Sequence, residues 1–145
     1  MSGHEPAPAG RRTAIPVSRL AAPAGTLVAV GAAFAYVGAV DPGEPGHYPV
    51  CPLLRFTGLY CPGCGGLRCA HALVHGDLAG ALGANALAVA AFGVFALFMV
   101  HWVVRVLRAR PVTVPLRTSH WWALGVLALA FTVVRNLPAG AALAP

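Results

Sequence analysis

The sequence predicts an all-α membrane protein with three transmembrane helices and a short interfacial helix in a Cys-rich extracytoplasmic loop. Of its 145 residues, 58% are hydrophobic and only 10% are charged, whereas soluble domains carry about 25% charged residues. Three apolar runs approach the length of about 20 residues that a bilayer core requires. This composition excludes a soluble globular enzyme and a nucleic-acid-binding module, and it indicates an integral membrane protein.

The first apolar run occupies residues 20–40. As a helix with a rise of about 1.5 Å per residue, it covers roughly 30 Å, the thickness of a bilayer core. A cleaved secretory signal is the competing interpretation, but the run is longer than the apolar part of such a signal. Residues 1–19 are polar, contain the Arg11–Arg12 pair and show no hydrophobic period. We therefore expect them to form a disordered cytoplasmic tail.

Residues 41–82 form the predicted Cys-rich loop. It opens with the proline- and glycine-rich stretch 41–46, which is typical of turns. Residues 67–75 are then predicted to form a short helix, because Arg68, His71 and His75 fall on one face and apolar residues fall on another. Such a helix suits the membrane surface. Asp77 is placed to cap the helix that follows.

The second and third spans are predicted over residues 84–105 and 119–137. Gly83 and Asn85 mark the point where the second span enters the membrane, and Trp102, Trp121 and Trp122 suit an aromatic belt at one interface. Residues 138–145 carry no signal for secondary structure, and we expect them to form an extracytoplasmic tail.

The distribution of arginine predicts the orientation of the spans. All ten basic residues are arginines, and three lie in residues 1–19 and four between the second and third spans. The Cys-rich loop holds only two, beside three acidic residues. Because cytoplasmic segments carry the excess of positive charge, we expect a cytoplasmic N-terminus and an extracytoplasmic Cys-rich loop in a bacterial inner (plasma) membrane.

Four cysteines fall within residues 51–69, and three interpretations are open for them: Cys51, Cys61, Cys64 and Cys69. In an oxidising compartment, a disulfide from Cys51 to Cys61 or Cys64 would stabilise the loop by about 2–4 kcal/mol. The C-x-x-C spacing of Cys61 and Cys64 is also typical of thiol–disulfide exchange, because a cysteine that precedes a helix gains acidity from the helix dipole.

The third interpretation is a metal site, with zinc as the ion. Cys61, Cys64, His71 and His75 form the pattern C-x2-C-x6-H-x3-H. Two histidines one helical turn apart share a face, and a C-x2-C pair can supply two thiolates. The gap between the two pairs is shorter than in zinc fingers.

A cluster of polar residues is predicted at the extracytoplasmic ends of the second and third spans. Its members are Asp77, Asn85, Arg135 and Asn136. A charge at bilayer depth is costly unless it is paired or reaches the headgroups. We expect Arg135 to meet Asp77 or the carbonyl groups of the Cys-rich loop, and so to hold that loop on the bundle. The alternative is that Arg135 extends to lipid headgroups.

The loop contains a recognisable set of motifs: Cys51-Pro52, Thr57-Gly58, Cys61-Pro62-Gly63-Cys64-Gly65, Leu67-Arg68 and, further on, Asn85 and Arg135-Asn136. With these motifs the chain resembles the bacterial membrane family filed as domain of unknown function 2752, from about residue 51 to residue 137. The resemblance implies a small helical membrane protein without an assigned reaction. The chain departs from the family pattern at Leu67, where threonine is usual, and at Ala86, where proline is common. Cys69 lies outside the pattern, which suggests a buried free thiol.

No catalytic triad, phosphate-binding loop or pair of carboxylates is evident in a chain with four acidic residues. We therefore expect a non-catalytic accessory or assembly subunit of a larger bacterial membrane complex, with a respiratory (cytochrome) supercomplex as the specific candidate. Its expected partners are other integral membrane subunits and lipids, without nucleic acid and without a cofactor. The alternatives are a membrane thiol–disulfide oxidoreductase that uses Cys61 and Cys64, and a zinc-binding membrane protein.

Overall fold

The computed structural model describes residues 17–44, 46–114 and 117–143, and within these ranges every regular element is a helix. The elements are α1 (Val17–Ala39), α2 (Pro52–Thr57), α3 (Gly66–Val74), α4 (Leu78–Leu107), α5 (Thr118–Arg135) and the short 3-10 helix η1 (Pro138–Leu143). The all-α prediction is confirmed for the described residues. The short helix expected over residues 67–75 is α3, displaced by one residue.

Two of these helices, α1 and α4, are long and apolar enough to cross a membrane. A helix in the core of a soluble protein would be mostly buried, but only 11% and 6% of the apolar windows of α1 and α4 are buried. Their outer faces carry large apolar side chains, such as Leu97, which is 72% exposed. Apolar surface of this extent suits a lipid environment. The 18-residue helix α5 is not among the helices that meet the same criterion of length and hydropathy.

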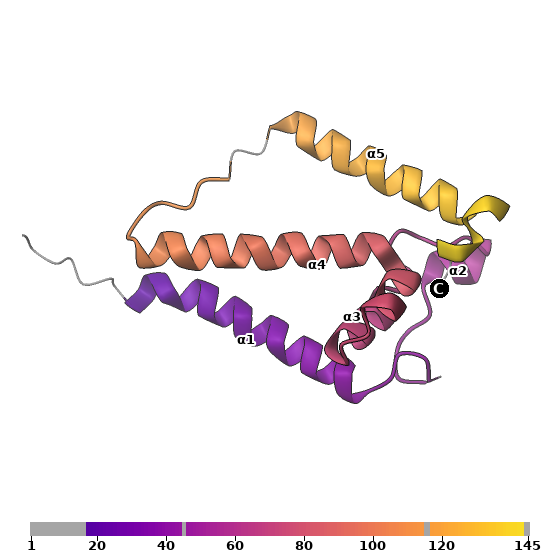
Figure 1. The fold of residues 1–145 in the computed structure, drawn as a ribbon, viewed down its shortest axis with the longest axis horizontal. Coiled ribbons are helices and arrows are strands. Elements are labelled where there is room, and N and C mark those ends of the chain that lie inside the picture. Colours follow the sequence, from indigo (N-terminus) through magenta and orange to yellow (C-terminus); the bar gives the residue numbers. More distant parts are fainter. Residues whose placement is uncertain (1–16, 45, 115–116, 144–145) are drawn as a thin grey trace, which may run out of the picture.

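Helices α1 and α4 run antiparallel and side by side, and α3 packs across both near the C-terminal end of α1 (Figure 1). The rings of Phe34 and Phe92 meet edge to face at 5.2 Å between α1 and α4. Where α1 meets α3, a Cβ atom at Gly38 would lie 2.7 Å from Cγ1 of Val74. The absence of a side chain at Gly38 therefore allows the two backbones to approach closely.

Helix α5 is attached differently. It packs against η1, which also contacts α4, but none of α1, α3 and α4 packs along the length of α5 in the described part of the chain (Figure 1). Its apolar side chains are accordingly exposed: Trp122 is 73% exposed and Leu129 is 65% exposed. The C-terminal end of α5 is thus attached to the rest of the structure, and most of its length does not pack against α1, α3 or α4.

The structure differs from the sequence predictions in three places. The segment before Tyr60 contains α2, because Pro52 fits the first helical turn and Gly58 adopts a left-handed conformation (φ 71°) that ends the helix. Helix α4 begins at Leu78, inside the predicted loop, because the Asp77 carboxylate accepts the Gly80 N–H at 2.8 Å. The expected C-terminal tail includes η1, whose Leu143 carbonyl accepts a hydrogen bond from Arg135.

The expected disordered tail falls mainly on residues 1–16, which lie outside the described residues. Val17–Arg19, its last three residues, already belong to α1.

Candidate functional site

The motif Cys61–Gly65 forms a tight turn that brings two thiols together. The Cys64 N–H donates to the Cys61 carbonyl at 3.1 Å, and Pro62 occupies the second turn position, where its fixed φ is favoured. Gly65 then adopts φ 80°, a left-handed conformation that glycine reaches without steric cost. The turn places the Sγ atoms of Cys61 and Cys64 3.1 Å apart.

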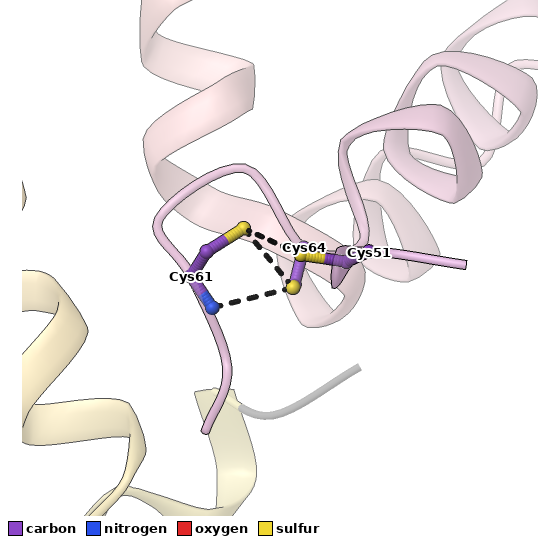
Figure 2. A group of neighbouring side chains, drawn as sticks. All are labelled: Cys51, Cys61 and Cys64. Carbon is purple, nitrogen blue, oxygen red and sulfur yellow. Dashed lines mark hydrogen bonds between the residues drawn. The ribbon is translucent and has the colours of Figure 1, made fainter. Parts of the chain in front are cut away.

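Cys51 joins this pair from the end of the preceding segment. It sits immediately before α2, and its Sγ lies 3.5 Å from the Sγ of Cys61. The three sulfur atoms all lie within 4.8 Å of one another (Figure 2). We refer to Cys51, Cys61 and Cys64 as the thiol cluster. All four cysteines are free thiols, and the fourth, Cys69, is fully buried in α3 outside the cluster.

Three side chains from α4 and the end of α5 hold the backbone of this turn: Asn85, Arg135 and Asn136, which we call the polar clamp. The Asn136 amide accepts the Tyr60 N–H and donates to the Tyr60 carbonyl, both at 2.9 Å. The Cys64 carbonyl accepts from both Asn85 Nδ2 and Arg135 Nη1, each at 3.0 Å. Segments more than 70 residues apart in sequence are therefore joined through one turn.

Asn85 has two functions in this arrangement. Its extended backbone (φ −167°) interrupts α4, and its Oδ1 accepts the Ala88 N–H at 2.9 Å, so that it caps the helical segment that follows. Its Nδ2 is then free to donate to the Pro62 carbonyl at 2.8 Å and to the Cys64 carbonyl. The side chain is 1% exposed, and all its polar atoms are used. The predicted membrane entry point thus coincides with a kink in α4.

Arg135 is a buried cation without an acidic partner among the described residues. It is 2% exposed. Its Nη1 donates to the Cys61 and Cys64 carbonyls and its Nη2 to that of Leu143, and its guanidinium lies 5.0 Å from the centre of the Phe131 ring. Its Nε has no hydrogen-bond partner. Because a buried charge is costly unless it is compensated, Arg135 favours negative charge in the turn that it contacts.

The thiols of the cluster differ in acidity. A hydrogen bond from the backbone N–H of Leu54, with smaller contributions from the Cys61 and Cys64 thiols, lowers the pKa of Cys51 to about 7. Burial is the main cause that raises the pKa of Cys64 to about 12. Burial also raises the pKa of Cys69. Of Cys51 and Cys64, Cys51 therefore forms its thiolate at the lower pH.

The structure brings some of the predicted site residues together and separates others. Cys61 and Cys64 of the expected zinc set lie together, but His71 and His75 do not join them. The His71 Nδ1 lies 2.8 Å from the Val37 carbonyl of α1, and the His75 Nδ1 lies 2.9 Å from the His71 carbonyl. Cys51, which the disulfide interpretation grouped with Cys61 and Cys64, lies with them instead of the two histidines. The repeated Cys-Pro step at residues 51 and 61 was the sequence signal for this pairing.

The expected polar cluster also loses one member. Arg135 meets the carbonyl groups of the loop, which was one of the three arrangements considered for it. Asp77 makes no ion pair with Arg135 in the described chain, because its carboxylate is engaged with the first turn of α4. Its role is that of a helix cap.

The family described as a protein of unknown function (DUF2752) matches residues 51–99. The match covers about a third of the chain, and it contains the whole thiol cluster and Asn85. Arg135 and Asn136 lie beyond it. The resemblance expected from the sequence motifs is confirmed over this range. No curated protein and no solved structure matches the chain.

Proposed function

We propose that α1, α4 and α5 are three membrane spans, with the N-terminal end of α1 in the cytoplasm and the thiol cluster on the extracytoplasmic side of a bacterial plasma membrane. The distribution of arginine supports this orientation. The 18 residues of α5 are close to the minimum for a span, and Trp121 and Trp122 at its start suit a membrane interface. Antiparallel α1 and α4 are consistent with consecutive spans.

We further propose that the thiol cluster binds a zinc ion through Cys51, Cys61 and Cys64. The observation that carries this proposal is the convergence of three thiols within 4.8 Å. Zinc lies about 2.3 Å from each thiolate, so that two sulfurs on one tetrahedral ion are roughly 3.8 Å apart. The Cys61 and Cys64 sulfurs are 3.1 Å apart, and the Cys51 and Cys61 sulfurs are 3.5 Å apart. Soft thiolate ligands select zinc over hard cations such as Mg²⁺.

The charge of such a site suits its surroundings. Three thiolates and one Zn²⁺ carry a net charge of −1, beside the buried guanidinium of Arg135. The Arg135 contacts to the Cys61 and Cys64 carbonyls give this charge a fixed position next to the ligands. The metal would then join α2, the turn and the ends of α4 and α5 into one structural unit.

In this proposal the protein is a non-catalytic accessory or assembly subunit of a larger membrane complex. The supporting observation is that α5 is fixed only at its C-terminal end, so that an exposed apolar helix is presented to its surroundings. A neighbouring membrane subunit is a natural partner for such a helix. A respiratory supercomplex is the candidate assembly, by analogy with the small subunits of such complexes.

Metal analysis tests the zinc proposal. The protein is purified in mild detergent with reductant and without chelator, and zinc is measured per chain. We expect stoichiometric zinc in the unaltered protein and in Cys69→Ser, the matched control outside the cluster, and loss of zinc in Cys51→Ser and Cys64→Ser. Zinc that persists in Cys51→Ser, or a metal-free protein with a disulfide within the cluster, would contradict the proposal.

A thiol–disulfide oxidoreductase is the second candidate function. The 3.1 Å separation of the Cys61 and Cys64 sulfurs and the lowered pKa of Cys51 favour it. Oxidation would form the Cys61–Cys64 bond as a partner disulfide is reduced, with two electrons and two protons passing to that partner. This candidate predicts that Cys64→Ser accumulates a mixed disulfide with a partner, whereas the zinc proposal predicts none.

Co-purification tests the subunit proposal independently of the metal. A tagged chain is isolated from membranes in mild detergent, and the proteins that elute with it are identified by mass spectrometry. We expect a stoichiometric set of membrane subunits. A chain that elutes alone, with its zinc retained, would overturn the subunit role and leave the metal site standing.

A further inference from the structure

A long apolar groove lies between α1 and α4, in the half of the molecule that lies away from the thiol cluster. It has a volume of about 600 Å³, within the range of roughly 300–1,000 Å³ found for small-molecule sites. Its walls come from both helices and are apolar, and the larger side chains that line it include Leu27, Phe34, Phe92, Phe95 and Met99. The groove therefore suits a long hydrocarbon chain.

A second hollow of about 480 Å³ continues along the same pair of helices. The apolar groove reaches Val104 of α4, and the second hollow begins at Val106 and includes Arg19 of α1 and Arg110 from the turn after α4. Two arginines thus line one hollow, at the end of the molecule that carries most of the arginines.

The end of α4 is folded in a way that keeps Arg110 at this hollow. Ala109 adopts a left-handed conformation (φ 50°), which turns the chain at the end of the helix. Arg105 donates to the Pro111 carbonyl through Nε and Nη2, at 3.0 Å and 2.6 Å, and its guanidinium is thereby committed to the turn. Arg110 makes no such contact in the described chain and lines the hollow instead.

No acidic side chain lines either hollow. The acidic residues of the described chain are Asp41, Glu44 and Asp77, and all of them belong to the segments at the other end of α1 and α4. The two arginines therefore create a positive potential beyond the Val104 end of the apolar groove. This combination is complementary to an anionic headgroup attached to a hydrocarbon tail.

We propose that the α1–α4 groove is a binding site for an anionic phospholipid. Its phosphate lies between Arg19 and Arg110, and one acyl chain lies along Phe34, Phe92 and Phe95. The predicted orientation places this end of the molecule at the cytoplasmic leaflet, where anionic lipids are attracted to basic side chains. The proposal does not involve the thiol cluster, and the two sites lie at opposite ends of α4.

Native mass spectrometry of the full chain tests the headgroup contacts. The purified protein is exposed in mild detergent to equal amounts of phosphatidylglycerol and phosphatidylcholine, and the ratio of the two retained lipids is measured. We expect a preference for phosphatidylglycerol in the unaltered protein. This preference should fall about fivefold in Arg19→Gln and about fivefold in Arg110→Gln, each as a single variant. Arg108→Gln is the control, because Arg108 is exposed at the same end of α4 but does not line the hollow.

A second pair of variants tests the position of the tail. Ala96 lines the apolar groove, whereas its neighbour Leu97 is 72% exposed and does not. We expect Ala96→Trp to fill the groove and to lose retained lipid, and Leu97→Trp to keep it. Zinc content per chain should stay unchanged in every variant. Circular dichroism verifies that each variant is folded, and if Ala96→Trp does not fold, the two arginine variants decide the test.

Several outcomes would overturn the proposal. An equal loss of selectivity in Arg108→Gln would show a diffuse charge effect in place of a site. If the chain retains a second copy of itself in place of lipid, the groove is a dimer interface. Displacement of the lipid by glycerol phosphate would show a pocket for a soluble phosphate. Unchanged selectivity in both Arg19→Gln and Arg110→Gln would leave no headgroup site.

Discussion

The two ends of α5 differ in how they are attached to the rest of the structure. At its C-terminal end, Arg135 and Asn136 form hydrogen bonds to the turn of the thiol cluster, and η1 packs against the helix. Towards its N-terminal end, Trp121 and Leu124 are 62% and 54% exposed. In the three-span arrangement proposed above, apolar contact between helices gains little over contact with lipid. Polar contacts therefore decide where α5 is attached, although most of its surface is apolar.

The contrast also separates two kinds of helix contact in this molecule. The contact of α3 with α1 combines close approach at Gly38 with the contact between His71 Nδ1 and the Val37 carbonyl, and it involves no arginine or acidic side chain. The attachment of α5 rests on the three residues of the polar clamp. Loss of one clamp residue should thus release α5 while α1, α3 and α4 stay together.

The largest expected effect follows from Arg135→Ala. It removes the three hydrogen bonds that Arg135 donates to carbonyl groups, although the Cys61 and Cys64 carbonyls keep a second donor in the Cys64 N–H and in Asn85 Nδ2. At about 1 kcal/mol for each lost hydrogen bond, the free energy of unfolding should fall by about 3 kcal/mol. Thermal unfolding in detergent measures the change. The exposed Arg55 supplies the control, and Arg55→Ala should have little effect. A loss of the same size in both variants would refute the clamp.

Arg135→Lys sharpens the same test. It keeps the positive charge but cannot reproduce the planar set of donors. We expect a stability between those of the unaltered protein and Arg135→Ala. If Arg135→Lys is fully stable, charge alone holds the turn, and the geometry of the guanidinium is unimportant.

A smaller effect is expected from Asn85, where the capping function can be separated from the clamp function. Asn85→Ser keeps a side-chain oxygen that can cap the following helix, but loses the donors to Pro62 and Cys64. Asn85→Ala loses both functions. The alanine variant should be less stable than the serine variant by about 1 kcal/mol, the typical contribution of a cap. Equal stabilities would show that the cap adds nothing at this kink.

The acidity of the thiols provides a prediction on pH. In the reduced, metal-free protein, alkylation of Cys51 should accelerate as the pH rises through about 7, because the thiolate is the reactive form and the pKa of Cys51 is lowered to that value. Cys64, with a pKa raised to about 12, should stay unreactive over the same range. Site-resolved mass spectrometry after short alkylation measures both rates. A midpoint near 9 for Cys51 would contradict the lowered pKa.

The sequence predicted the elements better than their contacts. The apolar runs at α1 and α4 and the amphipathic pattern of α3 are local signals, and the corresponding helices formed. Helix α2 was missed because its six residues are too few to show a period, so that only Pro52 and Gly58 mark it. The spacing of His71 and His75 predicted a shared face but could not show that His71 bonds to Val37 of α1.

Contacts between distant segments explain the rest of the difference. The sequence indicated that Arg135 needs a partner, but Asp77 and the loop carbonyl groups were equally suitable on charge and polarity. Which of these partners Arg135 contacts depends on the kink at Asn85. At this kink the Asn85 side chain and Arg135 both donate to the Cys64 carbonyl, so that the turn and the end of α5 lie together. A kink caused by one extended residue inside an apolar run has no periodic signal. The third span stays a prediction from hydropathy and arginine distribution.

The smallest expected effect concerns the part of α5 that is not attached. Leu124 and Leu127 are about half exposed and no helix of the described chain packs along them, so that the double substitution Leu124→Ala and Leu127→Ala should change the stability of the isolated protein by less than about 0.5 kcal/mol. The same substitution should reduce the recovery of partner subunits if this surface docks onto a neighbouring helix. Ala substitutions at Leu97 and Val94, on the exposed side of α4, provide the matched control for loss of exposed apolar surface. A large loss of stability in the isolated chain would mean that α5 packs on its own bundle along its length, and the contrast between its two ends would fail.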